Sequence, residues 1–286
     1  MNLTDYNEIK ELLVRHGFRF SKSLGQNFLT AAWVPEQIAD SALIDSSTGV
    51  LEVGPGIGCL TEQLSRRAAK VISVELDKTL MPVLSETLTG CDNTEVLFAD
   101  ILKTDLNEIV KNDFAGLKPV VCANLPYNVT SPVLTKLVTS GLFDAVTIMI
   151  QREVARRICA PAGDPDYSAF GILMQWYTRP EILFDVPPSC FVPQPKVTSS
   201  VIRLVKREHP PVAVENEEQM FALIRASFNQ RRKTLVNAVS SNVKGIDKDS
   251  LSAVLEECGF DMRVRGEALS VSDFAAISDK ISKKIG

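Results

Sequence analysis

The chain has 286 residues, with 31 Lys and Arg against 35 Asp and Glu, and its net charge at pH 7 is −4. This length allows one sizeable α/β domain and a small second domain. The six cysteines lack the paired short spacings and neighbouring histidines of a zinc site or a disulfide framework. The amino terminus has no basic start followed by an apolar stretch, and no segment approaches the roughly 20 apolar residues that span a bilayer. We therefore expect a cytoplasmic protein that uses no metal.

The first predicted element is a helix near the amino terminus. Residues 6–14 have helical spacing, with Thr4 or Asp5 as the cap and Gly17 as the terminator. The loop at 25–27 follows, and we expect it to close over a bound ligand.

Four apolar segments come next, and each ends in a polar residue. They are 49–52, 71–75, 96–100 and 119–124, with Glu52, Glu75, Asp100 and Asn124 at their ends. The end residues follow one another at intervals of 23, 25 and 24, about the length of one strand and its return helix in a parallel sheet. Because ligands of such sheets bind at the carboxyl ends of the strands, we expect the four side chains to line one crevice.

The turn after the first of these strands, residues 54–58, reads Gly-Pro-Gly-Ile-Gly. Such turns serve nicotinamide, flavin and methyl-donor enzymes alike. Glu52 precedes the turn, and residues 50–60 contain no cation that would offset its repulsion of a pyrophosphate. S-adenosylmethionine has no phosphate and carries a sulfonium and an ammonium group, so the pattern favours a methyl donor over a dinucleotide. Glu75 would accept hydrogen bonds from its ribose hydroxyls, and Asp100 from its adenine amine.

The tetrapeptide Asn124-Leu125-Pro126-Tyr127 ends the fourth strand and indicates a site that methylates an amine. The amide oxygen of Asn124 and a backbone carbonyl freed by the Leu-Pro bend can accept hydrogen bonds from an exocyclic NH₂ group, while Tyr127 offers a face to a base. Taken alone, the four residues are more often a strand that ends in a Pro-Tyr turn. The strand pattern upstream favours the methylation site.

Phe191 lies in a proline-rich stretch at 187–196. The flanking prolines restrict its backbone, so its ring can be presented rigidly. From these residues alone, Phe191 either plugs the core or forms a second face, opposite Tyr127, for an adenine extruded from its stack.

The remaining periodicity predicts further strands and a helical carboxyl-terminal region. Helices are expected at 131–140 and 167–176, strands at 145–150, 181–186 and 199–206, and helices at 217–228, 233–242, 248–258 and 270–285. A linker at 208–211 separates them. The fold class is therefore α/β, with a Rossmann-like methyltransferase sheet in domain 1–207 and a small all-helical, RNA-binding domain at 208–286.

Positive charge gathers in three places despite an isoelectric point near 5.4. The groups are Arg225, Arg231, Arg232 and Lys233; Arg152, Arg156 and Arg157; and Lys10, Arg15, Arg19 and Lys22. Each alone is usually a solvated face with scattered partners. Jointly they predict a basic face that binds nucleic acid with a strong salt dependence.

The chain resembles the ribosomal RNA adenine dimethyltransferases, most closely the bacterial small-subunit group. The resemblance spans nearly the whole chain and lies in segments 22–29, 52–56, 74–77, 99–100, 124–128, 151–154, 186–188, 191–197 and 228–233. It implies transfer of two methyl groups from S-adenosylmethionine to N6 of each of two adjacent adenines near the 3′ end of the small-subunit RNA. It also implies a ribosome-assembly intermediate as the partner. We expect a monomer, although the sequence alone leaves the oligomeric state open.

Site residues carry over from the matching motifs. The resemblance places donor contacts at Asn27, Leu29, Gly54, Glu75, Asp100 and Asn124. It places the target adenine against Asn124, Pro126, Tyr127 and Phe191. Many relatives carry a second aromatic residue where this chain has Asn128, which leaves the outer wall of the pocket open.

Two other functions remain possible on the sequence alone. Relatives of this fold methylate a large-subunit adenine and confer macrolide resistance, and they share the donor loop and the Asn-Leu-Pro-Tyr segment. Segments 191–197 and 228–233 look more like the small-subunit enzymes. Distant members serve as non-catalytic nucleic-acid-binding factors, but the intact Glu75, Asp100 and Asn124 favour an enzyme.

Overall fold

The computed structural model describes residues 1–18, 25–243 and 245–285, which form two compact units. The first unit comprises Met1–Ala155 and Tyr177–Lys206, and the second comprises Arg156–Trp176 and Arg207–Gly286. The division after Lys206 lies next to the expected domain boundary at residue 207. It differs from the expected domains in one respect: residues 156–176 group with the carboxyl-terminal helices.

Aromatic packing explains that grouping. The Trp176 ring lies edge-on to Phe221, with centroids 5.8 Å apart, and the Tyr167 ring lies edge-on to Phe228 at 5.6 Å. Trp176 and Tyr167 are both almost fully buried, and burying a large aromatic side chain contributes about 1.5–3 kcal/mol. Residues 156–176 thus supply part of the core of the second unit.

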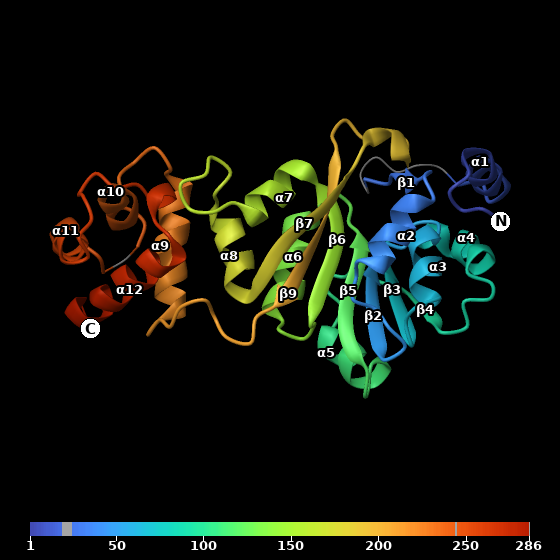
Figure 1. The fold of residues 1–286 in the computed structure, drawn as a ribbon, viewed down its shortest axis with the longest axis horizontal. Helices are drawn as coiled ribbons and strands as arrows, with labels where there is room; N and C mark the ends of the chain where they lie inside the picture. The colour runs from blue at the N-terminus through green and yellow to red at the C-terminus, as the bar shows by residue number, and fades with distance from the viewer. Residues whose placement is uncertain (19–24, 244, 286) are drawn as a thin grey trace. The chain divides into compact units, whose positions relative to one another are not determined.

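A seven-stranded mixed sheet forms the centre of the first unit (Figure 1). Its strands are β2 (Thr48–Val53), β3 (Lys70–Glu75), β4 (Thr94–Phe98), β5 (Lys118–Asn124), β6 (Ala145–Gln151), β7 (Thr178–Val186) and β9 (Ser199–Lys206). Their order is β4-β3-β2-β5-β6-β9-β7; neighbours from β4 to β6 are parallel, and β9 is antiparallel to both β6 and β7. The predicted Rossmann-like methyltransferase sheet is confirmed. The predicted strand ends fit closely, although β4 ends at Phe98, before Asp100.

The helices of this unit connect and cover the strands. They are α1 (Tyr6–Arg15), α2 (Trp33–Asp40), α3 (Cys59–Ser65), α4 (Met81–Thr87), the short α5 (Leu106–Glu108) and α6 (Thr130–Thr139). Helix α2 packs against α3 and β6, and α6 also packs against β6. Asp5 is the cap of α1, since its carboxylate accepts from the backbone N–H groups of Asn7 and Glu8.

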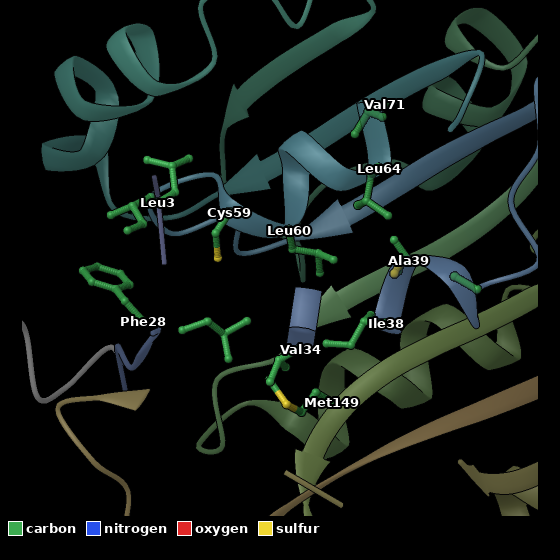
Figure 2. Close-up of a cluster of buried hydrophobic side chains, with 14 of the residues drawn as sticks. Leu3, Phe28, Val34, Ile38, Ala39, Cys59, Leu60, Leu64, Val71 and Met149 are labelled. Atoms are coloured by element: carbon green, nitrogen blue, oxygen red, sulfur yellow. The ribbon is translucent and has the colours of Figure 1, made fainter. Parts of the chain in front are cut away.

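The amino-terminal segment is tied into the unit by a two-stranded ladder and by apolar packing. Strand β1 (Phe28–Leu29) pairs antiparallel with β8 (Phe191–Val192), so that Leu29 lies opposite Phe191. Figure 2 shows the apolar cluster around them, drawn from the amino-terminal segment, α2, α3 and the sheet. Its labelled members are Leu3, Phe28, Val34, Ile38, Ala39, Cys59, Leu60, Leu64, Val71 and Met149.

The described part of the second unit is helical. It contains α8 (Ala169–Tyr177) up to Trp176, α9 (Glu217–Asn229), α10 (Leu235–Ser240), α11 (Lys248–Glu257) and α12 (Val271–Ile285). Helix α7 (Arg152–Cys159) begins in the first unit and ends in the second. Side chains of Asn216, Thr234 and Asp247 cap α9, α10 and α11, and the cap at Thr234 starts α10 later than the predicted residue 233. Among the described helices, none combines the length and the apolar character needed to cross a bilayer.

Candidate active site

The ends of four parallel strands converge on one cavity in the first unit. Glu52, Glu75 and Asn124 lie at or next to the last residues of β2, β3 and β5, and Asp100 lies just beyond β4. All four line the same cavity, which has about 1220 Å³ of space including its open mouth. This is the crevice that the strand spacing predicts.

The cavity also collects the other predicted contacts of the donor and the base. Its wall includes Asn27, Leu29, Gly54, Pro126, Tyr127 and Phe191. These residues come from the amino-terminal segment, the turn after β2, the turn after β5 and the proline-rich stretch. Lys22, Ser23 and Leu24, the first residues of the amino-terminal motif, lie outside the described residues.

The glycine-rich turn has a backbone that side chains would disturb. Gly54, Gly56 and Gly58 all have positive φ, at 72°, 60° and 92°. A Cβ on Gly58 would lie 2.8 Å from the Leu88 side chain, and one on Gly56 would lie 3.3 Å from the ring of Phe28. The backbone conformation therefore requires glycine at all three positions, and a side chain at Gly56 or Gly58 would also crowd a neighbouring side chain.

Glu52 is the most unusual polar group of the cavity. It is 1% exposed, and its Oε2 accepts hydrogen bonds from Thr61 Oγ1 at 2.7 Å and Ser73 Oγ at 2.6 Å. Its Oε1 is buried and has no hydrogen-bond partner among the described residues. Burial, with a smaller contribution from the charge of Glu75, raises the pKa of Glu52 to about 7. An unpaired buried acceptor beside a cavity fits a ligand that carries positive charge.

Glu75 and Asp100 are held by the backbone that follows each of them. Glu75 Oε1 accepts from the Asp77 N–H at 2.8 Å, and burial raises the pKa of Glu75. Asp100 Oδ1 accepts from the Leu102 N–H at 2.9 Å. The charged groups among the described lining residues are thus carboxylates, which favours a cationic ligand over a phosphorylated one.

Hydrogen bonds hold the amino-terminal segment against the cavity. Gln26 Nε2 donates to Asp77 Oδ2 at 2.6 Å, and Asn27 Nδ2 donates to the Gly25 carbonyl at 3.0 Å. A Cβ on Gly25 would lie 3.3 Å from Asn128 Oδ1, so this segment also meets the turn after β5. Asn128 therefore forms part of the outer wall.

Tyr127 and Phe191 differ in how much of each ring is covered. Phe191 is 3% exposed and belongs to the buried apolar cluster, so it fills the core as well as lining the cavity. Tyr127 is half-buried, and its hydroxyl is 2.7 Å from Ser199 Oγ. The side-chain amide of Asn124 has no hydrogen-bond partner within the described part of the chain, so both its donor and its acceptor are available.

Sequence reasoning did not single out the apolar rim of the cavity. Leu76 is 56% exposed and Leu102 is 40% exposed, yet both line the cavity together with Ile101. Leu76 directly follows Glu75, and Ile101 and Leu102 are the first two residues after Asp100; these positions were the signal that could have found them. Exposed leucines beside a carboxylate suit the flat face of a purine.

The predicted basic residues of the second unit divide into two kinds. Arg231 is engaged by the protein: its guanidinium donates to Glu267 Oε2 at 3.2 Å and to the Pro165 carbonyl at 3.1 Å, and it lies 5.9 Å above the Phe228 ring. Arg225, Arg232 and Lys233 are exposed, and these three have no ion-pair partner among the described residues.

Arg263 joins the free cations although the sequence did not point to it. The N–H of Leu235, two residues after Lys233, donates to the Val264 carbonyl at 2.8 Å. That bond places the exposed Arg263 beside the start of α10. Arg232, Lys233 and Arg263 thus lie on neighbouring segments, and none of the three side chains has an ion-pair partner among the described residues; we call these three residues the basic cluster.

Some residues of the other two predicted basic groups form ion pairs within the protein. Arg152 lies 3.7 Å from Asp185, and Arg15 forms an ion pair with Glu86, which His16 also contacts at 2.7 Å. Arg19 and Lys22, two members of the predicted amino-terminal basic group, lie outside the described residues.

Sheet order, glycine-rich turn and strand-end carboxylates together define the class of S-adenosylmethionine-dependent methyltransferases. A family model described as "Ribosomal RNA adenine dimethylase" matches residues 17–283. The chain therefore belongs to the ribosomal RNA adenine dimethylase family.

Individual relatives support the same family assignment. A "Ribosomal RNA small subunit methyltransferase A" of Geobacillus thermodenitrificans is 47% identical over 95% of this chain and 94% of its own length, and one of Bacillus cereus is 45% identical over 96% of each. Among solved structures, a dimethyladenosine transferase from Plasmodium falciparum is 29% identical with a TM-score of 0.73, over 87% of this chain and 95% of that one. The 23S rRNA methyltransferase ErmE has a TM-score of 0.68 over 89% of this chain and 99% of its own; at 24% identity this likeness shows the shared fold alone.

Proposed function

We propose that this protein transfers methyl groups from S-adenosylmethionine to N6 of two adjacent adenines near the 3′ end of small-subunit ribosomal RNA, giving N6,N6-dimethyladenosine. The observation that carries the proposal is that buried carboxylates and the Asn124–Tyr127 turn line one and the same cavity. Small-subunit methyltransferases among the relatives support the choice of RNA.

Three carboxylates hold the donor in this proposal. The unpaired Oε1 of Glu52 favours the cationic end of S-adenosylmethionine, Glu75 accepts from the ribose hydroxyls, and Asp100 accepts from the adenine amine. Leu76 and Leu102 cover the faces of the donor's purine. Asn27, Leu29 and Gly54 complete the wall around it.

Asn124 and the bend at Pro126 hold the acceptor. The free amide oxygen of Asn124 and the backbone carbonyl of Leu125 accept the two hydrogens of the adenine N6. Tyr127 and Phe191 fix the plane of the base. Holding both hydrogens turns the nitrogen lone pair, otherwise delocalised into the ring, toward the methyl group.

Positioning supplies most of the rate. S-adenosylmethionine brings an electrophilic methyl group when bound, and the residues of the cavity align the nitrogen with it. Orientation of this kind contributes roughly 7–11 kcal/mol to a displacement between two bound partners. No strong base is needed, because the nitrogen becomes acidic once it is methylated and loses its proton afterwards.

The second unit binds the RNA backbone. Arg225 and the basic cluster contact phosphates, and each contact that releases counterions adds about 0.7–0.9 to the slope of log affinity against log salt. Arg231 instead holds its own loop through Glu267 and Pro165. We further propose that the enzyme acts as a monomer in the cytoplasm, where ribosomal subunits assemble, and uses no metal.

The test is to incubate the protein with labelled S-adenosylmethionine and small subunits from a strain that lacks this modification, with a chelator present. Digestion of the RNA should release labelled N6,N6-dimethyladenosine from two adjacent positions. Label in large-subunit RNA instead, or activity that needs added metal, would contradict the proposal.

A further inference from the structure

Ser199 is a buried residue at the start of β9 that the function described above leaves unused. It is fully buried, and its backbone pairs with Gln151 of β6 on one side and Val186 of β7 on the other. A residue held by two ladders at once has little freedom to move. Its Oγ lies 2.7 Å from the Tyr127 hydroxyl.

Tyr127 needs such a fixed partner more than Phe191 does. Phe191 is held by core packing and by the β1–β8 ladder. Tyr127 lies on a turn and is only half-buried, so core packing restrains its ring less than it restrains the ring of Phe191. The bond to Ser199 anchors the far end of the ring, while the turn anchors the near end.

We propose that Ser199 is a positioning residue, whose hydroxyl fixes the plane of the Tyr127 ring against which the target adenine stacks. This inference rests on the proposed function and deepens it. Ser199 does not touch the base; it acts through Tyr127.

The second methyl transfer depends on this bond more than the first. The unmodified N6 amine has two hydrogens, which Asn124 and the Leu125 carbonyl can both hold. The monomethylated amine has one hydrogen left, so one of these two hydrogen bonds is lost. Stacking then carries a larger share of the alignment, and a loosely held Tyr127 should leave the reaction stopped at N6-methyladenosine.

The test compares three variants of the full chain on small subunits: Ser199→Ala, Tyr127→Phe and the double variant. We expect each single variant to raise the ratio of monomethylated to dimethylated adenine at least about tenfold, since small misplacements of reacting groups have effects of this size. Donor affinity, measured by calorimetry, should not change. The double variant should match the single variants, because both changes remove the same hydrogen bond.

Ser200→Ala is the matched control. Ser200 is the next residue on β9, is equally buried and loses its own hydrogen bond, to Asp185, when truncated. It should keep the wild-type product ratio. If Ser199→Ala folds poorly, Tyr127→Phe still tests the bond from the exposed side.

A wild-type product ratio in both single variants, or effects that add in the double variant, would overturn the role of Ser199. Failure of the proposed function would give a different result: the wild-type protein itself would yield no dimethyladenosine from small subunits.

Discussion

The cavity of the first unit and the basic cluster of the second unit treat charge in opposite ways. In the cavity, Glu52 and Glu75 are buried and held by hydrogen bonds of 2.6–2.8 Å. In the basic cluster, Arg232 and Lys233 are exposed and unpaired among the described residues. Fixed buried groups select one small ligand by its shape and charge, whereas free surface cations bind any polyanion and release counterions. The two regions should therefore fail separately.

The largest effect is expected from Asn124→Ala. This change removes the acceptor that holds the amine, so methylation should fall by two or more orders of magnitude, on the order of 3 kcal/mol of transition-state stabilisation. RNA binding, measured by filter retention, should stay at the wild-type level. Unchanged turnover would remove Asn124 from the mechanism.

Glu52→Gln should separate stability from donor binding. The pKa of Glu52 is about 7 in the folded protein, above its ordinary value of 4.5. The unfolded chain therefore loses this proton first, and the free energy of unfolding of the wild type should fall as pH rises from about 4.5 to 7. The glutamine variant avoids that loss and should be more stable at pH 8 by up to about 3 kcal/mol.

The same variant should bind S-adenosylmethionine more weakly, since it lacks the buried negative charge. Thermal unfolding between pH 4 and 8 and donor titration at pH 8 measure the two effects. A variant that is less stable at pH 8 and binds the donor normally would contradict this account of Glu52.

Gln26→Glu tests the fastening of the amino-terminal segment. The change sets a second carboxylate against Asp77 in place of a hydrogen bond of 2.6 Å, so donor affinity should drop by about 1–2 kcal/mol. Adding Asp77→Asn restores a donor and acceptor pair and should recover most of the affinity. Failure of the double variant to recover would mean that the contact does not hold the segment.

The smallest effects are expected at the surface of the second unit. Neutralising Arg232, Lys233 or Arg263 to Gln should lower the salt slope of RNA binding by about 0.7–0.9 each and leave donor affinity unchanged. Arg231→Gln is the control within the same region. It should keep the slope and lower the free energy of unfolding by less than about 1 kcal/mol, because its ion pair with Glu267 is partly exposed. If Arg231→Gln lowered the salt slope by as much as the other three variants do, Arg231 would be a phosphate contact and not a structural residue.

The sequence predicted the parallel strands well because each is an apolar run that ends at a polar residue with a regular spacing. Helix α2 was not among the expected elements, and its start at Ala32 has no side-chain capping bond, so the usual start signal is missing. The two-residue ladder of β1 and β8 was also beyond prediction, since two residues show no period and the partner lies far along the chain.

Much of the candidate site could be predicted from motifs, because its residues lie at the ends of strands. The long-range hydrogen bonds that hold the site could not be predicted. The bonds from Gln26 to Asp77 and from Tyr127 to Ser199 join segments that no local pattern relates. Charge runs were equally ambiguous: Arg231 and Arg232 are neighbours in sequence, yet only Arg231 is engaged by Glu267.

The most direct test measures donor and RNA dissociation constants for two variants side by side. In Glu75→Ala the donor constant should rise while the RNA constant stays near wild type. In the triple variant Arg232→Gln, Lys233→Gln, Arg263→Gln, the RNA constant should rise while the donor constant stays near wild type. If either variant weakens both ligands to the same extent, the cavity and the basic cluster do not have the separate roles assigned to them.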